Sequence, residues 1–336
     1  MQTNAILLND FTTQACLTKG GPGEEDSLLV TGKDESVNAQ AGMMDAGSVE
    51  TEWNEYHQGW RRKTGEIIGE EMVTIYVNGL ELATMMCTPQ KLDHLGLGFL
   101  KNEGFIEHLT EVDHVHIGGN GCCVDIWLTH AIQHPNRRII TSGCGSGVTF
   151  LDPLGDLESM QDGLQIAPEK LISLFNRLHI PGSLHARARG VHTAGLTNGE
   201  RLLVIAEDVG RHNTIDKLAG ACLVDGLDTR GLILLTTGRV SSEMLRKGVA
   251  MGCSIIASRN SPTSLSVRLA EAAGITLVGY ARQGRLRAFT HAHRLTFSND
   301  NNGTSAEQAP FFCRKMISSS EEFFSIRVVN FSALDK

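Results

Sequence analysis

The sequence predicts an α/β protein whose second half is a sheet covered by helices. From Arg201 onward, short apolar runs alternate with helical patterns, as strands and helices do in such folds. These runs are continuous, which is typical of strands buried on both faces of a parallel sheet. Of the 336 residues 41% are hydrophobic, enough for a sizeable core. We therefore expect a largely parallel sheet in this half.

The first half is predicted to be richer in strands. EMVTIYVNG alternates Val73, Ile75 and Val77 with other residues before the turn at Asn78-Gly79, and LELATMMC is the predicted return strand. EVDHVHIGG and CCVDIWL indicate two further strands. The pattern thus predicts a hairpin followed by a second pair of strands.

Two helices are predicted beside these strands. Thr88 and Pro89 indicate a helix start with threonine as the cap, and Gly104 indicates its end. Pro168 begins another predicted helix, which stops before Pro181. Both carry apolar residues at helical spacing, so each is expected to pack one face on a core.

The second half is predicted to alternate four strands with three helices. The strands are RLLVIAED, GLILLTTG, CSIIAS and ITLVGYAR. Ser241 and Ser261 are the predicted caps of the last two helices, with Pro262 at a first helical position. The short loops between them favour consecutive packing of strands and helices.

The chain is predicted to divide into four parts. Residues 1–60 are rich in Gly, Ser and acidic residues without sustained periodicity, so we expect a mobile extension. Residues 61–150 are the β-rich part, and residues 151–295 are the α/β part. Residues 296–336 begin with a polar linker and form a tail.

Composition excludes several classes of protein. The formal net charge of -8 argues against a nucleic-acid coat. No apolar run approaches a membrane span, and MQTNAILLND has neither the basic nor the long apolar region of a secretory signal. Eight scattered cysteines do not form the dense pattern of a secreted disulfide scaffold. We therefore expect a cytoplasmic protein with reduced thiols.

Arginines recur near the carboxyl ends of the predicted strands. In open α/β sheets this edge binds ligands, and arginine favours phosphate oxygens. Any one of these arginines fits a solvated surface residue, but the set predicts a pocket for a phosphorylated ligand. Its candidate residues are Arg211, His212, Arg239, Arg259, Arg282 and Arg285, with Asp208, Thr237, Asn260 and Arg287 beside them.

Cys144 lies among small residues in RRIITSGCGSG. A thiol there should be accessible, and the nearby Arg137 and Arg138 would lower its pKa. Such a cysteine fits a nucleophile or a persulfide carrier, and it equally fits an incidental loop cysteine. The chain has no C-x-x-C pair and no zinc-deaminase signature, so we expect no zinc site. Cys122 or Cys123 is a conceivable resolving thiol.

Seven segments together resemble the formate dehydrogenase accessory sulfurtransferase family (FdhD). They occur in family order from about Met72 to His291 and cover most of the chain. EDVGRHN and TGRVSSEM are the most specific of them. The segments are IYVNGLELATMMCTPQKLDHLGLGFLKNEGFI, RIITSGCGSG, VHTAGL, EDVGRHNTIDKLAG, TGRVSSEML, IIASRNSPTSLSVRLAE and TLVGYARQGRLRAFTH.

The resemblance implies a cytidine-deaminase-like α/β core without its zinc site, and a homodimer. It implies that a cysteine desulfurase supplies sulfur as a persulfide on Cys144. The implied acceptor is the bis-guanine-dinucleotide molybdenum cofactor, which formate dehydrogenase requires. The cofactor-binding segment of the family falls on Tyr280, Ala281, Arg282, Gln283, Gly284 and Arg285.

The chain departs from the family at one position of the cysteine loop. The family pattern is C-G-x-C-G, but Gly147 stands where the second cysteine would be. Sulfur relay requires one thiolate that attacks one persulfide, so we expect Cys144 to work alone. The alternative is a non-catalytic, cofactor-binding chaperone of formate dehydrogenase. A nucleobase deaminase follows from fold analogy only and lacks the metal ligands.

Overall fold

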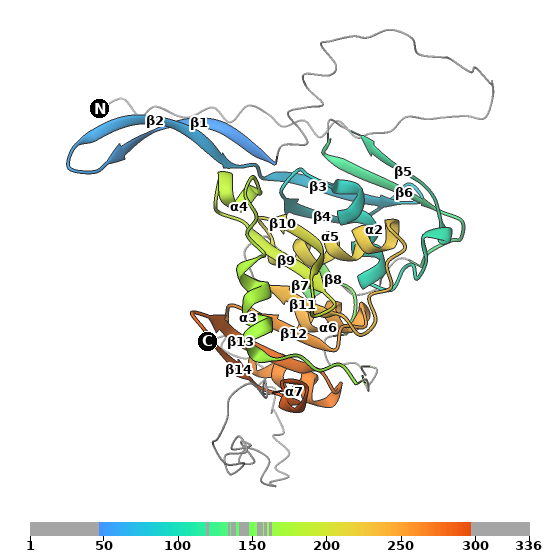
Figure 1. The fold of residues 1–336 in the computed structure, drawn as a ribbon. Helices are drawn as coiled ribbons and strands as arrows, with labels where there is room; N and C mark the ends of the chain where they lie inside the picture. The colour runs from blue at the N-terminus through green and yellow to red at the C-terminus, as the bar shows by residue number, and fades with distance from the viewer. Residues whose placement is uncertain are drawn as a thin grey trace, which may run out of the picture. The chain divides into compact units, whose positions relative to one another are not determined.

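A computed structural model of this chain describes residues 47–118, 121–133, 135, 139–140, 148–152, 157, 160 and 163–296. Within them lie a four-stranded sheet and a six-stranded sheet, with helices α2 and α5 between the two (Figure 1). The predicted α/β class is confirmed, and the cytidine-deaminase-like arrangement stays a prediction. No helix in this described part is long and apolar enough to cross a membrane.

The four-stranded sheet has the order β4-β3-β6-β5, and its strands are those predicted for the first half. Only β3 and β6 pair in parallel, and the other two pairings are antiparallel. Asn78 and Gly79 both have positive φ angles, as a two-residue hairpin turn requires. The strands are β3 (Glu71–Val77), β4 (Leu80–Cys87), β5 (Val112–Gly118) and β6 (Cys123–Leu128), with a 3-10 turn at Leu109–Glu111 before β5.

Helix α2 (Leu92–Asn102) covers the buried face of this sheet. The predicted cap at Thr88 is wrong, because Lys91 occupies the N-cap position. Thr88 is fully buried and contacts a different segment: its hydroxyl accepts a hydrogen bond from Val209 N at 3.0 Å, and its own N–H donates to Asp208 Oδ2 at 3.1 Å. Thr88 therefore connects β4 to the start of α5.

The six-stranded sheet has the order β10-β9-β11-β12-β13-β14, and it is mixed. The prediction of a largely parallel sheet is wrong, since only β11, β12 and β13 pair in parallel. Strand β9 lies antiparallel between β10 and β11. The strands are β9 (His192–Thr197), β10 (Leu202–Asp208), β11 (Ile233–Thr236), β12 (Ile255–Ser258), β13 (Thr276–Arg282) and β14 (Arg285–Ala288).

The insertion of β9 preserves the strand direction on which the site prediction depends. Because β10 and β11 are each antiparallel to β9, they run in the same direction as β12 and β13. The carboxyl ends of all four predicted strands therefore meet at one edge of the sheet. Loops at that edge can converge on a ligand.

Helices cover both faces of the six-stranded sheet. Helices α5, α6 and α7 pack on one face around Leu234, Ile256 and Leu277, and α3 packs on the other. The predicted cap at Ser241 is confirmed, but the cap of α7 is Thr263 and not Ser261. The helices are α3 (Pro168–Asn176), the short α4 (Leu184–Arg187), α5 (Arg211–Val224), α6 (Ser242–Ala250) and α7 (Ser264–Ala272), with a 3-10 turn at Ala292–Arg294.

Helices α2 and α5 touch backbone to backbone, and two glycines permit this contact. A Cβ added at Gly98 would lie 1.7 Å from the Asp216 carbonyl oxygen, and one at Gly220 would lie 1.9 Å from the His94 oxygen. Any other residue would force the two helices apart. This crossing fixes α5 between the two sheets.

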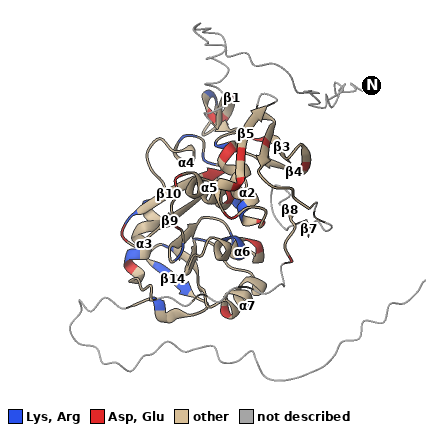
Figure 2. Cartoon of the chain, turned by 90° about the vertical axis from the view of Figure 1, so that its right-hand side faces the viewer, with Lys and Arg blue, Asp and Glu red and all other residues tan. Residues whose placement is uncertain are grey.

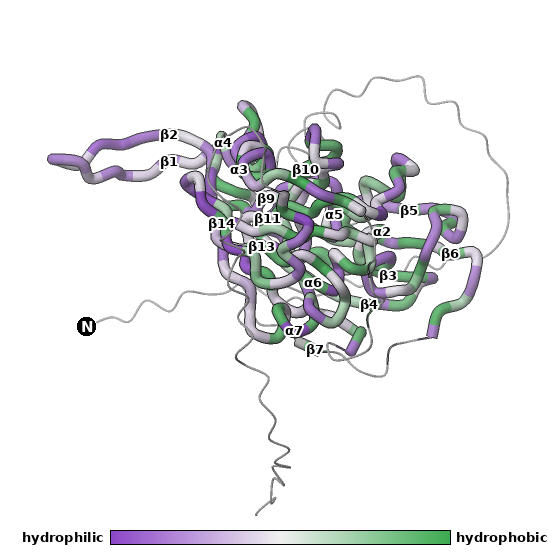
Figure 3. The backbone as a smooth tube through the Cα atoms, turned by 60° about the horizontal axis from the view of Figure 1, so that its bottom comes forward, coloured by the Kyte–Doolittle hydropathy of each residue, from purple (hydrophilic) through white to green (hydrophobic). Residues whose placement is uncertain are grey.

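The predicted irregular extension over residues 1–60 is wrong at its end. Strands β1 (Ser48–Tyr56) and β2 (Trp60–Ile68) form an antiparallel hairpin with β1 inside that range. Opposite charges pair across it, Glu52 with Arg62 and Glu55 with Lys63 at 2.6 Å. These polar strands are mostly purple and white in Figure 3. Strands β1 and β2 are held together by cross-strand ion pairs and lack the alternation of apolar residues from which a strand is predicted. The sequence pattern therefore does not reveal this hairpin.

The remaining predictions about domain limits stay open. The four-stranded sheet falls within residues 61–150 and the six-stranded sheet within 151–295, but the boundary near 150 stays a prediction. Two short strands, β7 (Ile139–Ile140) and β8 (Val148–Thr149), pair with each other on either side of residues 141–147. Residues 1–46 and 297–336, and with them the tail, lie outside the described residues.

Candidate functional site

A cleft of about 390 Å³ lies at the edge where the carboxyl ends of β11, β12 and β13 meet. Three successive strand ends contribute to it, as the sequence predicts for Arg259, Arg282, Ala281 and Gln283. Helix α3, the segment after it and α4 complete the wall. The lining residues are Ile172, Asn176, His179, His185, Val191, Thr237, Arg259, Asn260, Ala281, Arg282 and Gln283.

The described residues that line the cleft include no aspartate or glutamate. Arg259 and Arg282 give it positive charge, and the asparagine, glutamine and threonine side chains add neutral hydrogen-bonding groups. Figure 2 shows further basic residues, in blue, along β14, which pairs with β13. The arrangement is suited to an anionic ligand that also offers polar edges.

Arg259 is held from behind by α3 and the residues that follow it. Its Nη1 lies 2.6 Å from His179 Nε2, and its Nη2 donates to the Phe175 carbonyl oxygen at 2.9 Å. That oxygen lies in the last turn of α3, where the helix dipole favours a cation. Burial lowers the pKa of Arg259, which nonetheless remains a cation at neutral pH.

The segment from Tyr280 to Arg285 comprises the end of β13, the turn at Gln283-Gly284 and the first residue of β14. Gln283 and Gly284 have positive φ angles, as does Tyr280 at the bulge before them. The Tyr280 N–H donates to the Asn260 carbonyl oxygen at 3.1 Å, which joins the turn to the end of β12. Of this segment, Ala281, Arg282 and Gln283 line the cleft, and Tyr280, Gly284 and Arg285 do not.

Arg287 and Tyr280 contact each other beside this turn. The guanidinium carbon of Arg287 lies 4.4 Å from the centre of the Tyr280 ring, within the range of a cation–π contact. Arg282 and Arg285 are cross-strand partners and both are exposed. The turn therefore presents several guanidinium groups next to the cleft.

Like Arg285, the predicted residues Arg211, His212 and Arg239 are not among the residues that line this cleft. Arg239 is exposed in the loop before α6, and Arg211 and His212 are buried in the first turn of α5. His212 Nε2 lies 3.1 Å from Glu243 Oε2 and 3.4 Å from Ser241 Oγ. These residues do not line the cleft that holds Arg259 and Arg282, so their role in binding a ligand stays a prediction.

His192 connects Arg211 to the rim of the cleft. Its Nδ1 lies 3.4 Å from the hydroxyl of Thr237, a lining residue. Burial lowers the pKa of His192, and the charge of nearby Arg211 lowers it further. Arg211 therefore lies one side chain away from the cleft.

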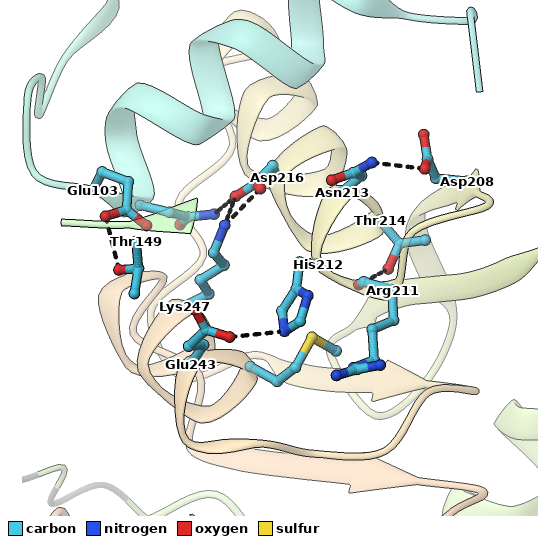
Figure 4. Close-up of polar contacts among 12 residues, drawn as sticks. Glu103, Thr149, Asp208, Arg211, His212, Asn213, Thr214, Asp216, Glu243 and Lys247 are labelled. Carbon is cyan, nitrogen blue, oxygen red and sulfur yellow. Dashed lines mark hydrogen bonds and ion pairs between the residues drawn. The ribbon is translucent and has the colours of Figure 1, made fainter. Parts of the chain in front are cut away.

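A buried polar network fixes the first two turns of α5 (Figure 4). Asp208 Oδ2 pairs with Lys217 Nζ at 2.6 Å, and its other oxygen accepts from the Gly210 N–H and the Asn213 amide. Asp216 pairs with Lys247 of α6 at 2.6 Å. The signature EDVGRHN thus supplies buried contacts that hold the fold, and Asp208 is not among the residues that line the cleft.

The same network extends to the strand that follows the cysteine segment. Glu103, just after α2, accepts hydrogen bonds from the Thr149 hydroxyl at 2.9 Å and the Phe150 N–H at 2.8 Å. Burial raises the pKa of Glu103, while the charge of Lys247 opposes that shift. Cys144 itself lies outside the described residues, as do Arg137 and Arg138.

The described thiols fall into two groups. Cys87, Cys222 and Cys253 are buried as predicted, and burial raises the pKa of Cys87 and of Cys222 to about 12. Such thiols are poor nucleophiles. Cys122 is exposed. Within the described ranges no three histidine, cysteine or acidic side chains gather as a metal site would require.

Sequence reasoning missed His179, His185 and His192. All three reach the site from segments whose local pattern carries no strand-end signal. The rings of His179 and His185 stack at 3.9 Å between centres, and both line the cleft. Only their packing against the strand ends reveals them.

Comparison with known proteins follows the same elements. The family model described as the FdhD/NarQ family matches residues 68–296, which include both sheets. The chain belongs to the FdhD/NarQ family. A protein of Bacillus subtilis named sulfur carrier protein FdhD is 33% identical over 249 residues, covering 70% of this chain and 95% of that protein.

Two further proteins are similar to this chain over most of its length. The sulfur carrier protein FdhD of Bacillus pumilus is 34% identical over 250 residues, covering 72% of this chain and 95% of its own. A crystal structure of a formate dehydrogenase accessory protein described as putative, from Desulfotalea psychrophila, superposes with a TM-score of 0.63 at 28% identity. The superposition covers 74% of this chain and 100% of the chain in that crystal structure.

Proposed function

We propose that this chain is a sulfur carrier that receives persulfide sulfur on Cys144 from a cysteine desulfurase. It delivers the sulfur to the bis-guanine-dinucleotide molybdenum cofactor, which formate dehydrogenase needs for activity. The cofactor is thus the substrate of the reaction. A cytoplasmic location and a homodimer belong to the same proposal. The names of the relatives support the sulfur carrier role.

The observation that carries this proposal is the acid-free cleft at the sheet edge. Its residues fit a nucleotide: Arg259 and Arg282 are suited to phosphate oxygens. Asn260 and Gln283 carry amides with both donors and acceptors, as the edge of a purine base does. Arg285 at the adjacent turn is available for a second phosphate.

The chemistry on Cys144 is an exchange without net oxidation. The Cys144 thiolate attacks the terminal sulfur of the donor persulfide, and a new S–S bond forms as the donor's S–S bond breaks. The donor cysteine leaves as a thiolate. One nucleophilic thiol is sufficient for this step, so Gly147 in place of a second cysteine does not prevent it.

Mass spectrometry tests the sulfur-carrying step. The full chain is incubated with a cysteine desulfurase and cysteine, and the Cys144 peptide is expected to gain one sulfur atom. The Cys144→Ala variant serves as the control for labelling elsewhere. Persulfide on another cysteine, with none on Cys144, would contradict the assignment.

The cofactor-binding chaperone is the rival function. It would need the cleft but not the thiol, because it would hold the cofactor without transferring sulfur. Under this rival Cys144→Ala keeps formate dehydrogenase activity in an accessory-deficient host, whereas Arg282→Ala abolishes it. Under the sulfur carrier proposal both variants lose that activity.

A further inference from the structure

We propose that His179 is a positioning residue, which orients the Arg259 guanidinium toward the phosphate of a guanine nucleotide in the cleft. This inference rests on the proposed function of the cleft. It starts from the two contacts that hold Arg259, namely His179 Nε2 at 2.6 Å and the Phe175 oxygen at 2.9 Å.

The contact with Arg259 fixes the tautomer of His179. A guanidinium group only donates hydrogen bonds, so His179 Nε2 must be the acceptor and carries no proton. In the neutral ring the proton then lies on Nδ1, which is buried and has no hydrogen-bond partner among the described residues. The ring is therefore a directed acceptor for Arg259.

The surroundings of His179 keep this ring neutral. Burial lowers the pKa of His179 to about 4, and the positive charges of His185, Arg259 and Arg189 contribute in that order. No carboxylate contributes to the shift. At neutral pH His179 thus remains an acceptor, whereas a protonated ring would repel the guanidinium it holds.

Two fixed contacts leave Arg259 prepared for a ligand. The guanidinium has five N–H donors, and the contacts with His179 and Phe175 use one N–H on each of its two terminal nitrogens. Because Arg259 lines the cleft, the remaining N–H groups lie on a side chain whose direction is already set. A preorganised arginine loses less conformational entropy on binding than a mobile one. Among the described residues no side-chain hydrogen bond holds the exposed Arg282 in this way.

The stacking of His179 on His185 provides the competing explanation. The two rings lie 3.9 Å apart with an angle of 18° between their planes, so His179 could serve only to pack α4 against the wall. The two roles need different parts of the ring. Positioning needs the Nε2 acceptor, while packing needs the flat aromatic surface.

Two substitutions separate the roles. His179→Gln supplies an amide oxygen as acceptor without the ring, and His179→Phe keeps a ring without an acceptor. Guanosine diphosphate binding is measured by calorimetry at pH 7.5 for both variants and the unsubstituted chain, with thermal unfolding as the test of folding. His179→Gln is expected to bind within about threefold of the unsubstituted chain, and His179→Phe about tenfold more weakly.

The outcomes are distinguishable. Unchanged binding by His179→Phe, or weaker binding by His179→Gln than by His179→Phe, would overturn the positioning role and leave the cleft as the nucleotide site. Absence of guanosine diphosphate binding by the unsubstituted chain would contradict the proposed function itself, and the inference with it. If His179→Phe fails to fold, guanosine diphosphate binding is compared between His179→Gln and Arg259→Lys. Arg259→Lys should bind more weakly than His179→Gln, since Lys cannot donate to both His179 and Phe175 in a fixed fork. Equal binding by these two variants would overturn the positioning role.

Discussion

The buried network around α5 and the cleft at the sheet edge both use charged side chains, but they use them differently. In the network the Asp216 carboxylate has both of its oxygens bound by Lys247. In the cleft Arg259 has two structural partners and Arg282 is exposed, with no aspartate or glutamate among the described lining residues. Saturated pairs hold the fold, while unmatched positive charge is left for a ligand. Substitutions in the two regions should therefore affect different measurements.

The largest effect is expected from breaking the buried pair. Asp216→Ala leaves the Lys247 ammonium buried without its carboxylate, which should reduce the free energy of unfolding by about 3–5 kcal/mol. Chemical denaturation gives this number. The double variant Asp216→Leu/Lys247→Met should recover part of the loss, because the unpaired ammonium is removed, while buried Glu103 loses the nearby charge of Lys247. A single variant as stable as the unsubstituted chain would show that the pair does not hold α5.

The helix crossing should be nearly as sensitive. Gly98→Ala places a methyl group 1.7 Å from the Asp216 carbonyl oxygen, so the helices must separate at a cost of about 3 kcal/mol. Gly163→Ala is the control, since a Cβ there meets nothing within 4 Å. Equal unfolding midpoints for the two variants would contradict the close contact.

Substitution of an exposed arginine in the cleft should change ligand affinity and leave the free energy of unfolding unchanged. Arg282→Ala is expected to weaken guanosine diphosphate binding about tenfold, because a charged hydrogen bond to phosphate is lost. Its free energy of unfolding should stay within about 0.5 kcal/mol, as for other exposed side chains. Arg201→Ala, exposed at the other end of β10, is the control and should bind normally. If Arg282→Ala lowers the free energy of unfolding but leaves the affinity for guanosine diphosphate unchanged, Arg282 is a structural residue and not a ligand-binding one.

The smallest expected effect is a pH dependence that belongs to the cleft wall. His179 has a pKa of about 4, below its ordinary value of 6.5, so the folded chain binds fewer protons there than the unfolded chain. Stability from this group is present above pH 6.5 and is lost as the pH falls toward 4. The unfolding midpoint of the unsubstituted chain should therefore drop more steeply over that range than that of His179→Gln. Parallel curves would exclude a titrating His179.

The sequence predicts the strands and their shared edge because these depend on local pattern. Continuous apolar runs and the residues that follow them identify β11, β12 and β13 directly. Strand β9 escapes prediction because HTAGLT is short and rich in small residues. The nearby sequence indicates β9 only through the Asn198-Gly199 turn and the strand β10 that follows it and pairs with it.

Contacts between distant segments explain the other misses. Thr88 has the local features of a helix cap, yet its partners Asp208 and Val209 lie about 120 residues away. Likewise His179 meets Arg259 across 80 residues of sequence. Arg211 and His212 follow a strand as Arg259 does, but they are buried at the start of α5 and do not line the cleft. Local patterns contain no information about such packing.

The most direct test of the sulfur carrier proposal is restoration of formate dehydrogenase activity in a host that lacks its own accessory protein. The unsubstituted chain, Cys144→Ala and Arg201→Ala are expressed to equal levels, and formate oxidation is measured in cell extracts. The account predicts activity with the unsubstituted chain and Arg201→Ala, and none with Cys144→Ala. Full activity with Cys144→Ala would contradict it and would favour a cofactor-binding chaperone.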